Sequence, residues 1–369
     1  MLRPMVILRI VVALAGVAIV VWTGQQAIRT FVVARAVRLV LNRAVFISMR
    51  RIFHLVVRLK GATADRKRRD AIMAHWAPLS LVALPGVWVV LAMIGYAAIF
   101  WAVDQHGVRA AIEISGSSLL TLGFAAPGGF GPDLIAFSEA AVGLGLIALV
   151  IAYLPSIYAA YSRRELVVAM LDARAGVPPN ATQLVLRHHQ YGGLARLDRK
   201  WNEWERWVVD IGQTHMTHPF LAFFRSATWD HSWLTSTATL LDTANLRLSA
   251  ITLPGGGNAD ASMYLAAATR VVRDIAGFQQ IAVEHDGDHK LTPAELNASL
   301  DELDAVGVPL EKDRRLIWER FAARRAKYEP AVLGLASLLD AAPAPWSSDR
   351  APPVYIPPIL RRRRSTDPQ

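Results

Sequence analysis

The sequence predicts an all-α membrane protein with three transmembrane helices, a re-entrant pore helix and loop, and a C-terminal helical cytosolic domain. Of its 369 residues, 53% are hydrophobic, and the mean hydropathy of +0.29 is too high for an ordinary soluble protein of this length. The apolar excess lies in three blocks. The net charge of +10 is concentrated between Gly24 and His75, where 12 Lys and Arg accompany two Asp. Because a short basic stretch beside a spanning helix marks the cytoplasmic side, these features predict a multi-pass protein of the bacterial inner membrane.

The first predicted domain, residues 1–23, is a signal-anchor transmembrane helix. Residues 5–22 are apolar except for Arg9, and the stretch is long enough to cross a bilayer. A cleaved signal peptide would need a small-residue cleavage site, and cleavage would export the basic stretch that follows. We therefore expect an extracytoplasmic N-terminus and a cytoplasmic C-terminal domain.

Residues 24–75 form a basic segment that we expect at the cytoplasmic face. Arginines are mixed with apolar residues over 31–60, which favours an interfacial amphipathic helix over a costly straight span. A voltage-sensor helix would carry an arginine at every third position, and the spacing of Arg35 and Arg38 is not continued at positions 41 and 44. The other interpretation of a basic segment is nucleic-acid binding, which the flanking spans disfavour. The predicted partner is therefore the lipid membrane and no nucleic acid.

Residues 76–163 form the predicted pore module, made of an outer helix, a pore loop and an inner helix. The second span covers 77–103 and has tryptophans near both ends, where aromatic rings favour the membrane interface. A short helix at 110–120 is too brief to cross a bilayer, and the third span follows at 134–158. This order places the loop after the short helix on the outer side.

That loop carries the predicted site. A cation filter needs a ring of backbone carbonyls from several subunits, and glycines at alternate positions permit the backbone that aligns them. The C-terminal end of the preceding helix carries partial negative charge and favours a cation at the same place. The predicted filter residues are Thr121, Leu122, Gly123, Phe124 and Ala125.

Residues 77–165 resemble the two-transmembrane pore domain of potassium channels. The resemblance rests on the stretch 118–124 and on Glu139, Gly143 and Gly145 in the following helix. The family pattern is Thr-Val/Leu-Gly-Tyr/Phe-Gly, usually followed by Asp, whereas this chain has alanine at both of the last two positions. A left-handed alanine at the first of them costs about 1 kcal/mol or more, so we expect the backbone there to be strained or to differ from the family's. The resemblance implies a homotetrameric channel for monovalent cations, without specifying its selectivity.

Four residues of the third span are candidates for pore support or gating. Glu139 is an intramembrane carboxylate that either accepts hydrogen bonds behind the loop or lies in water near the outer interface. Gly143 and Gly145 either hinge the helix or allow close helix packing. Pro155 is expected to kink the inner end.

Residues 164–340 are predicted to form a helical cytosolic domain. Residues 182–210 show helical spacing, and one face of this segment and its continuation carries large apolar residues, as expected for a core or a subunit interface. They are Trp201, Trp204, Val208 and Ile211. Residues 341–369 are Pro-rich and contain a basic run, which predicts a disordered tail.

No residue pattern indicates an enzyme, a cofactor or a bound metal. The chain has no cysteine, which excludes disulfides and thiolate chemistry. His215 and His218 are three residues apart, but no carboxylate cluster stands beside them. The acidic stretch 284–289 lacks the ligand spacing of a calcium-binding EF-hand loop. The alternative to a channel is a non-conducting membrane sensor or scaffold with a degenerate pore loop and a partner-binding cytosolic domain.

Overall fold

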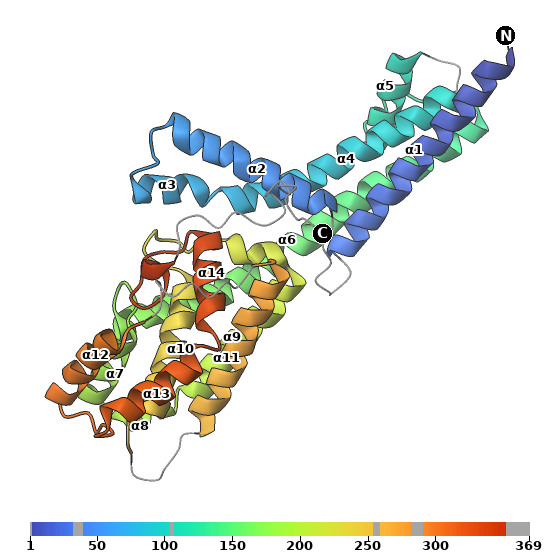
Figure 1. Ribbon diagram of the computed structural model, residues 1–369. Helices are drawn as coiled ribbons and strands as arrows, with labels where there is room; N and C mark the ends of the chain where they lie inside the picture. The colour runs from blue at the N-terminus through green and yellow to red at the C-terminus, as the bar shows by residue number, and fades with distance from the viewer. Residues whose placement is uncertain (1, 32–39, 104–106, 254–258, 282–290, 352–369) are drawn as a thin grey trace, which may run out of the picture. The chain divides into compact units, whose positions relative to one another are not determined.

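The computed structural model describes residues 2–31, 40–103, 107–253, 259–281 and 291–351 (Figure 1). Throughout these ranges the chain forms helices and loops, and the one β feature found there is an isolated antiparallel bridge between Ile251 and Leu310. The chain divides into two compact units, Met1–Ala159 and Ala160–Gln369. The predicted all-α class is confirmed.

Unit 1 contains the apolar helices that the sequence predicts. Among the described residues, three helices are long and apolar enough to cross a membrane, which is compatible with a membrane-embedded protein. They are α1 (Leu2–Phe31), α4 (Trp76–Val103) and α6 (Phe130–Ala175). α6 runs past the predicted third span and into unit 2. It ends before Gly176, whose φ of 84° is the left-handed conformation typical of a residue after a helix.

Two glycines bring α1 and α4 together. A Cβ on Gly16 would lie 2.5 Å from the carbonyl oxygen of Gly95, and a Cβ on Gly95 would lie 2.9 Å from the carbonyl oxygen of Gly16. No real Cβ tolerates such distances, so a larger residue at either position would force the backbones apart. Membrane helices use small residues at close crossings because lipid supplies no hydrophobic drive for association. The glycine pair therefore fixes how α1 packs on α4.

The basic segment contains the end of α1, which runs to Phe31, and two further described helices. α2 (Val40–Leu59) and α3 (Arg66–Met73) are joined by a turn, and the side chain of Asp65 caps α3 by accepting from the backbone N–H of Arg68. Within the predicted amphipathic helix over 31–60, the structure describes helix from Val40 to Leu59. Arg35 and Arg38 lie outside the described residues. α2 and α3 turn away from the axis of the paired helices α1 and α4 (Figure 1).

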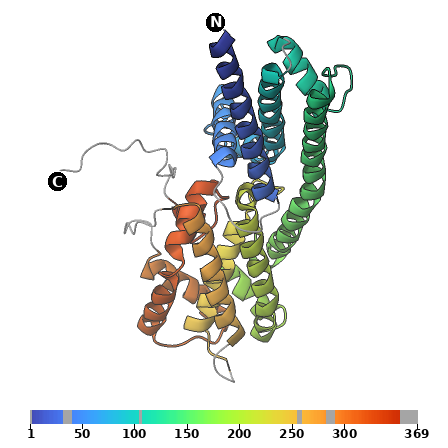
Figure 2. The ribbon, with the colours of Figure 1, turned by 90° about the vertical axis from the view of Figure 1, so that its right-hand side faces the viewer.

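Unit 2 is a helical domain built around α10 (Trp233–Ser249), which is buried on almost every side. The C-terminal end of α6 contributes Val168, Leu171 and Ala175 to its core. The surrounding helices are seen in Figure 2. They are α7 (Ala181–Gln190), α8 (Leu194–Asp198), α9 (Trp201–Thr217), η1 (Pro219–Phe223), α11 (Ala259–Phe278), α12 (Pro293–Ala305), α13 (Arg314–Arg325), α14 (Glu329–Leu339) and η3 (Ser348–Arg350).

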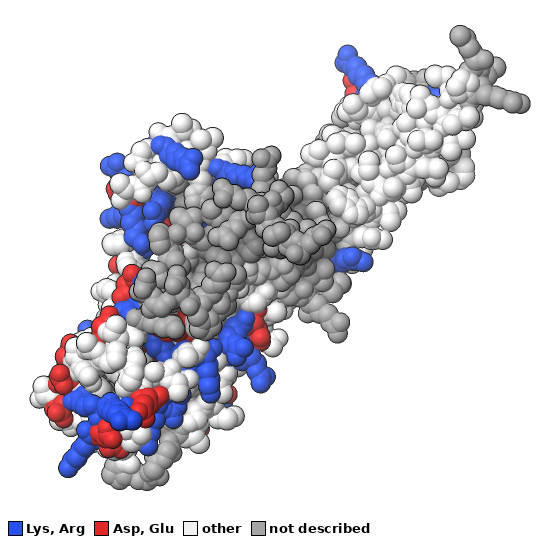
Figure 3. Space-filling model, viewed as in Figure 1, with Lys and Arg blue, Asp and Glu red and all other residues white. Residues whose placement is uncertain are grey.

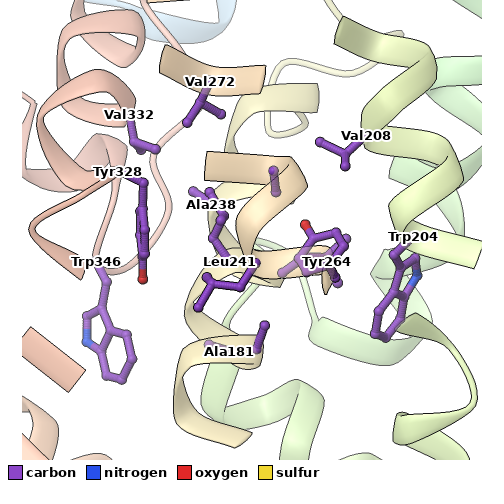
Figure 4. Packing of buried hydrophobic residues seen from close by; sticks show 14 of the residues in the cluster. Ala181, Trp204, Val208, Ala238, Leu241, Tyr264, Val272, Tyr328, Val332 and Trp346 are labelled. Atoms are coloured by element: carbon purple, nitrogen blue, oxygen red, sulfur yellow. The ribbon is translucent and has the colours of Figure 1, made fainter. Parts of the chain in front are cut away.

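The apolar stripe predicted between 201 and 211 lies in the core of unit 2. Trp204 and Val208 pack with Tyr264 of α11 and residues of α10 (Figure 4). Trp201 stands edge-on to Trp204, with ring centroids 5.0 Å apart. The helical spacing over 182–210 is interrupted, however, because the chain turns between α7 and α8. Two glycines at 192 and 193 adopt φ of 148° and 80° there, which other residues resist.

A buried ionic cluster ties α10 to the C-terminal helices. The guanidinium of Arg325 donates to Asp242 of α10 and, at 2.8 Å, to Glu329 of α14. It also donates to the carbonyl oxygen of Trp346, and the hydroxyl of Tyr328 donates to Asp242 at 2.7 Å. Burial raises the pKa of Asp242, while the neighbouring guanidinium and phenol oppose the rise. These bonds satisfy a charged group that would otherwise be costly inside the domain.

The predicted disordered tail is wrong for its first residues. Residues 341–351 pack onto unit 2, with Ala344 and Trp346 buried. Trp346 meets Phe321 edge-on at 6.0 Å between ring centroids, and its carbonyl oxygen accepts from Arg325. The Pro-rich composition excludes a long helix but does not prevent packing. Residues 352–369 lie outside the described residues.

Candidate functional site

The short helix predicted at 110–120 is α5 (Val108–Leu119), and its C-terminal half contacts both α4 and α6. The hydroxyl of Ser115 lies 3.0 Å from the carbonyl oxygen of Met93, which is ten residues before the end of α4. At 1.5 Å per residue, this contact is about 15 Å along α4 from its end. A Cβ on Gly143, which is 13 residues into α6, would overlap the carbonyl oxygen of Leu119 at the end of α5. α5 therefore ends roughly 15–20 Å along its neighbours, measured from Val103 at the end of α4 and from Phe130 at the start of α6.

The chain leaves α5 through a tight hydrogen-bonded turn. The N–H of Leu122 donates to the carbonyl oxygen of Ser117 at 2.8 Å, and the N–H of Thr121 donates to that of Ser118 at 3.1 Å. This pair of bonds is the Schellman arrangement, in which the first residue after the helix cap is left-handed and is usually glycine. Here that residue is Thr121, with φ of 53°. A β-branched residue in this conformation is a strained exception, and such strain concentrates at functional sites.

The structure places the predicted filter residues together in this turn. Gly123 is also left-handed, with φ of 72°, so left-handed residues alternate over 121–123. Leu122 and Phe124 are 59% and 68% exposed, which shows that neither side chain is covered within the single chain. The alternation ends before Ala125, which is not among the described residues with positive φ and whose N–H donates to the hydroxyl of Ser117. Of the two alternatives at position 125, strain or a different backbone, the positive φ expected for strain is absent at Ala125, and Thr121 is the non-glycine residue of this turn that has one.

Glu139 is buried against α5, so of its two predicted placements the one in water is wrong. Its side chain is fully buried, and the hydroxyl of Ser115 is 2.6 Å from its Oε1. That hydroxyl has one hydrogen for two acceptors, the carboxyl group and the carbonyl oxygen of Met93. The second oxygen of Glu139, Oε2, has no hydrogen-bond partner among the described residues. Glu139 thus links α6 to α5 while keeping one buried acceptor unsatisfied, which marks it as a functional candidate.

The two glycines of α6 differ in their surroundings. Gly143 is buried where the end of α5 touches α6, so the packing alternative accounts for it. A Cβ on Gly145 would meet nothing within 4 Å. Pro155 lies inside α6 without ending it, since the helix continues to Ala175. Of the four candidates from the third span, Glu139 and Gly143 are therefore the two that the described contacts place against α5.

Ser115 and Ser117 are site residues that sequence reasoning missed. Ser115 bonds to Glu139, and Ser117 holds the loop through Leu122 and Ala125. The available signal was a pair of small polar residues at alternate positions in the C-terminal half of the short helix. Their partners lie up to 24 residues away, so only the packing of α5 identifies them.

The histidines of unit 2 do not gather into a metal site. No group of three or more His, Cys, Asp or Glu that could hold a metal occurs within the ranges the structure describes, and the stretch 284–289 lies outside them. His215 is buried, and its Nδ1 lies 2.9 Å from the carbonyl oxygen of Ile211. Burial and the nearby Arg164 hold the pKa of His215 well below its usual value. It is therefore a neutral core residue.

His231, in contrast, is held between two carboxylates. Its Nε2 lies 2.7 Å from Asp172 near the C-terminal end of α6, and its Nδ1 lies 2.7 Å from Asp230. Burial lowers the pKa of His231, but the hydrogen bonds and charges of both aspartates outweigh it and raise the pKa above its usual value. The charged imidazole thus fastens the loop before α10 to α6.

Comparisons with known proteins add no family to this description. No family model, no curated protein and no solved structure matches the chain.

Proposed function

We propose that the protein is an oligomeric channel for monovalent cations, with α5 and residues 120–129 as its re-entrant pore segment. The observation that carries the proposal is the depth of the left-handed turn at Thr121 between the apolar helices α4 and α6. Residues 120–129 form no helix, and α6 begins at Phe130, about 20 Å along the helix axis from the contact at Gly143. The loop must therefore cover this distance to reach the start of α6. Ten extended residues span up to about 33 Å, so they suffice for the return.

Irregular backbone at this depth requires protein or water around it. Lipid cannot satisfy exposed N–H and C=O groups, so such backbone is tolerated only where it is buried in protein or lines a water-filled cavity. Leu122 and Phe124 are exposed in the single chain, which therefore does not bury the turn by itself. Copies of the chain around a common axis would cover its outer side and leave its inner side facing water. A homotetramer is the arrangement that the resemblance to potassium channels implies.

The electrostatics of the turn favour a cation. The last carbonyls of α5 carry the partial negative charge of a helix C-terminus, equivalent to roughly half an elementary charge. They point toward the turn that contains Thr121 and Gly123. The strain at Thr121 is explained if its carbonyl and hydroxyl oxygens are ligands, because glycine would fit the backbone better but has no hydroxyl.

The membrane orientation follows from the same topology. We propose that the protein lies in the bacterial inner membrane, with the turn entered from the outer side and unit 2 in the cytoplasm, because the basic residues of α2 and α3 lie between α1 and α4.

Planar-bilayer recording of the purified full chain tests the proposal. We expect cation current that Gly123→Ala abolishes and Thr121→Gly alters, with Gly86→Ala as a control at an α4 position that has open space for a Cβ. Thr121→Gly should also relieve strain of about 1 kcal/mol and raise the free energy of unfolding. No current under any potential, tension or ligand condition would contradict the proposal, and so would current that neither loop variant changes.

A further inference from the structure

α2 presents an exposed face that combines arginines with large aliphatic side chains. We call it the α2 face, and it comprises Arg51, Ile52, Leu55, Arg58 and Leu59. The residues are three, four and seven apart, so they share one side of the helix. Ile52, Leu55 and Leu59 are 52%, 55% and 77% exposed, so the protein covers none of these three apolar side chains.

The opposite side of α2 is fixed to α4. Val57 is buried, and Phe46 meets Trp76 edge-on with 6.4 Å between ring centroids. The indole N–H of Trp76 donates to the carbonyl oxygen of Phe46 at 3.2 Å, and the guanidinium of Arg50 lies over the same ring at 5.5 Å. Trp76 is the first residue of α4, one of the three apolar helices. The α2 face is therefore held at the end of a membrane-length helix and points away from it.

The surroundings of the α2 face are strongly basic. Residues 40–75 contain nine Lys and Arg and two Asp, one of which caps α3. Figure 3 shows Lys and Arg gathered over α2 and α3, whereas the surface over the α1 and α4 bundle carries little charge. Lys60 and Lys67, on either side of the turn between α2 and α3, are exposed. A surface with this charge attracts anions, and its aliphatic residues favour an apolar layer.

We propose that the α2 face binds the headgroups of anionic phospholipids, with Arg51 and Arg58 on the phosphates and Leu55 between them in the acyl boundary. Arginine suits this role because its planar guanidinium donates two parallel hydrogen bonds to a phosphate. The three aliphatic side chains give up contact with water when they enter the interface. Chain connectivity supports this occupant, since α2 and α3 lie between two candidate membrane spans, α1 and α4. The site is separate from the α5 turn, so it does not depend on conduction.

Native mass spectrometry of the full chain in neutral detergent, titrated with phosphatidylglycerol or phosphatidylcholine, tests the proposal. We expect the double variant Arg51→Gln/Arg58→Gln to bind phosphatidylglycerol roughly tenfold to thirtyfold more weakly, since each basic residue near an anionic surface contributes about a factor of five. The matched control, Arg315→Gln/Arg320→Gln, removes two exposed arginines from α13 and should bind as the unchanged chain does. Phosphatidylcholine binding should be the same in both double variants.

A second variant separates the apolar part of the site from its charge. Ile52→Ser/Leu55→Ser keeps both arginines and should weaken the binding of both lipids. Each variant is accompanied by its thermal unfolding midpoint, which should be unchanged because the substituted residues are exposed. Equal phosphatidylglycerol affinity in the arginine variant and the unchanged chain would overturn the proposal. A changed subunit count with unchanged lipid affinity would also overturn it, by making the α2 face a contact between copies of the chain.

Discussion

Replacing Gly143 by alanine tests the contact on which the position of α5 depends. The added Cβ would overlap the carbonyl oxygen of Leu119 and lie 3.0 Å from its carbonyl carbon. The obstacle is backbone at the end of a helix, which cannot rotate away as a side chain can, and Ser117 and Ser118 hold the turn that follows. Overpacking of this kind costs about 1–3 kcal/mol. We expect the variant to lose that amount from its free energy of unfolding, apart from the helix-propensity gain of alanine.

Gly145→Ala provides the matched control for that gain. It lies two residues further along the same helix, and its Cβ would meet nothing within 4 Å. Both substitutions replace glycine by alanine in a helix, with a propensity gain of up to about 1 kcal/mol. The difference between the two variants therefore isolates the clash with α5. Denaturant unfolding of the full chain in detergent measures it through the transition midpoint at unchanged slope. Equal free energies of unfolding for the two variants would refute the packing of α5 against Gly143.

Three further predictions concern the rest of the fold. Gly95→Val should separate α1 from α4 and lower the free energy of unfolding by about 1–3 kcal/mol. Gly86→Val, at an open position of α4, should change it by less than about 1 kcal/mol, because valine is the better helix former and its Cβ meets nothing there; denaturant titration compares the two variants. His231→Gln should destabilise the chain most at acidic pH, because the pKa of His231 is raised in the folded state. The stabilisation by the charged imidazole is complete below the unfolded pKa of about 6.5 and is lost as the pH rises through the higher folded pKa. Measuring the free energy of unfolding of both chains across this pH range tests the prediction. Arg325→Met should cost about 3–5 kcal/mol by leaving buried carboxylates without their counter-charge, and Arg315→Met, at an exposed pair, should cost less than about 1 kcal/mol in the same thermal unfolding assay.

The long elements of the fold could be predicted from the sequence because each depends on a local pattern. Apolar runs of spanning length predicted α1, α4 and α6, and a segment too brief to cross a bilayer predicted α5. The stripe from Trp201 to Ile211 predicted a helix with one apolar face, in a core or a subunit interface, because its spacing matches the period of a helix, and the structure buries that face in the core of unit 2. The tail was mispredicted because proline content reports on regular structure and not on burial, and Trp346 packs without a helix around it.

The details of the candidate site could not be predicted because they depend on contacts between distant residues. Gly143 and Gly145 are indistinguishable in sequence, and only the position of Leu119 separates them. The bond from Ser115 to Glu139 joins residues 24 apart. The sequence comparison left two possibilities at Ala125, a strained backbone or one that differs from the channel pattern, and it did not indicate that the hydrogen bonds ending α5 make Thr121 left-handed.

Thiol labelling of the turn after α5 tests most directly the central claim that this turn lines a water-filled pore. The chain has no native cysteine, so a single Leu122→Cys variant in a reconstituted membrane reports on that position alone. Val90→Cys is the control, because this residue is 49% exposed on the apolar helix α4. We predict that a charged, membrane-impermeant thiol reagent modifies the cysteine at 122 and leaves that at 90 unmodified. Absence of modification at 122, with full modification after the protein is denatured, would contradict a water-lined turn between the spanning helices.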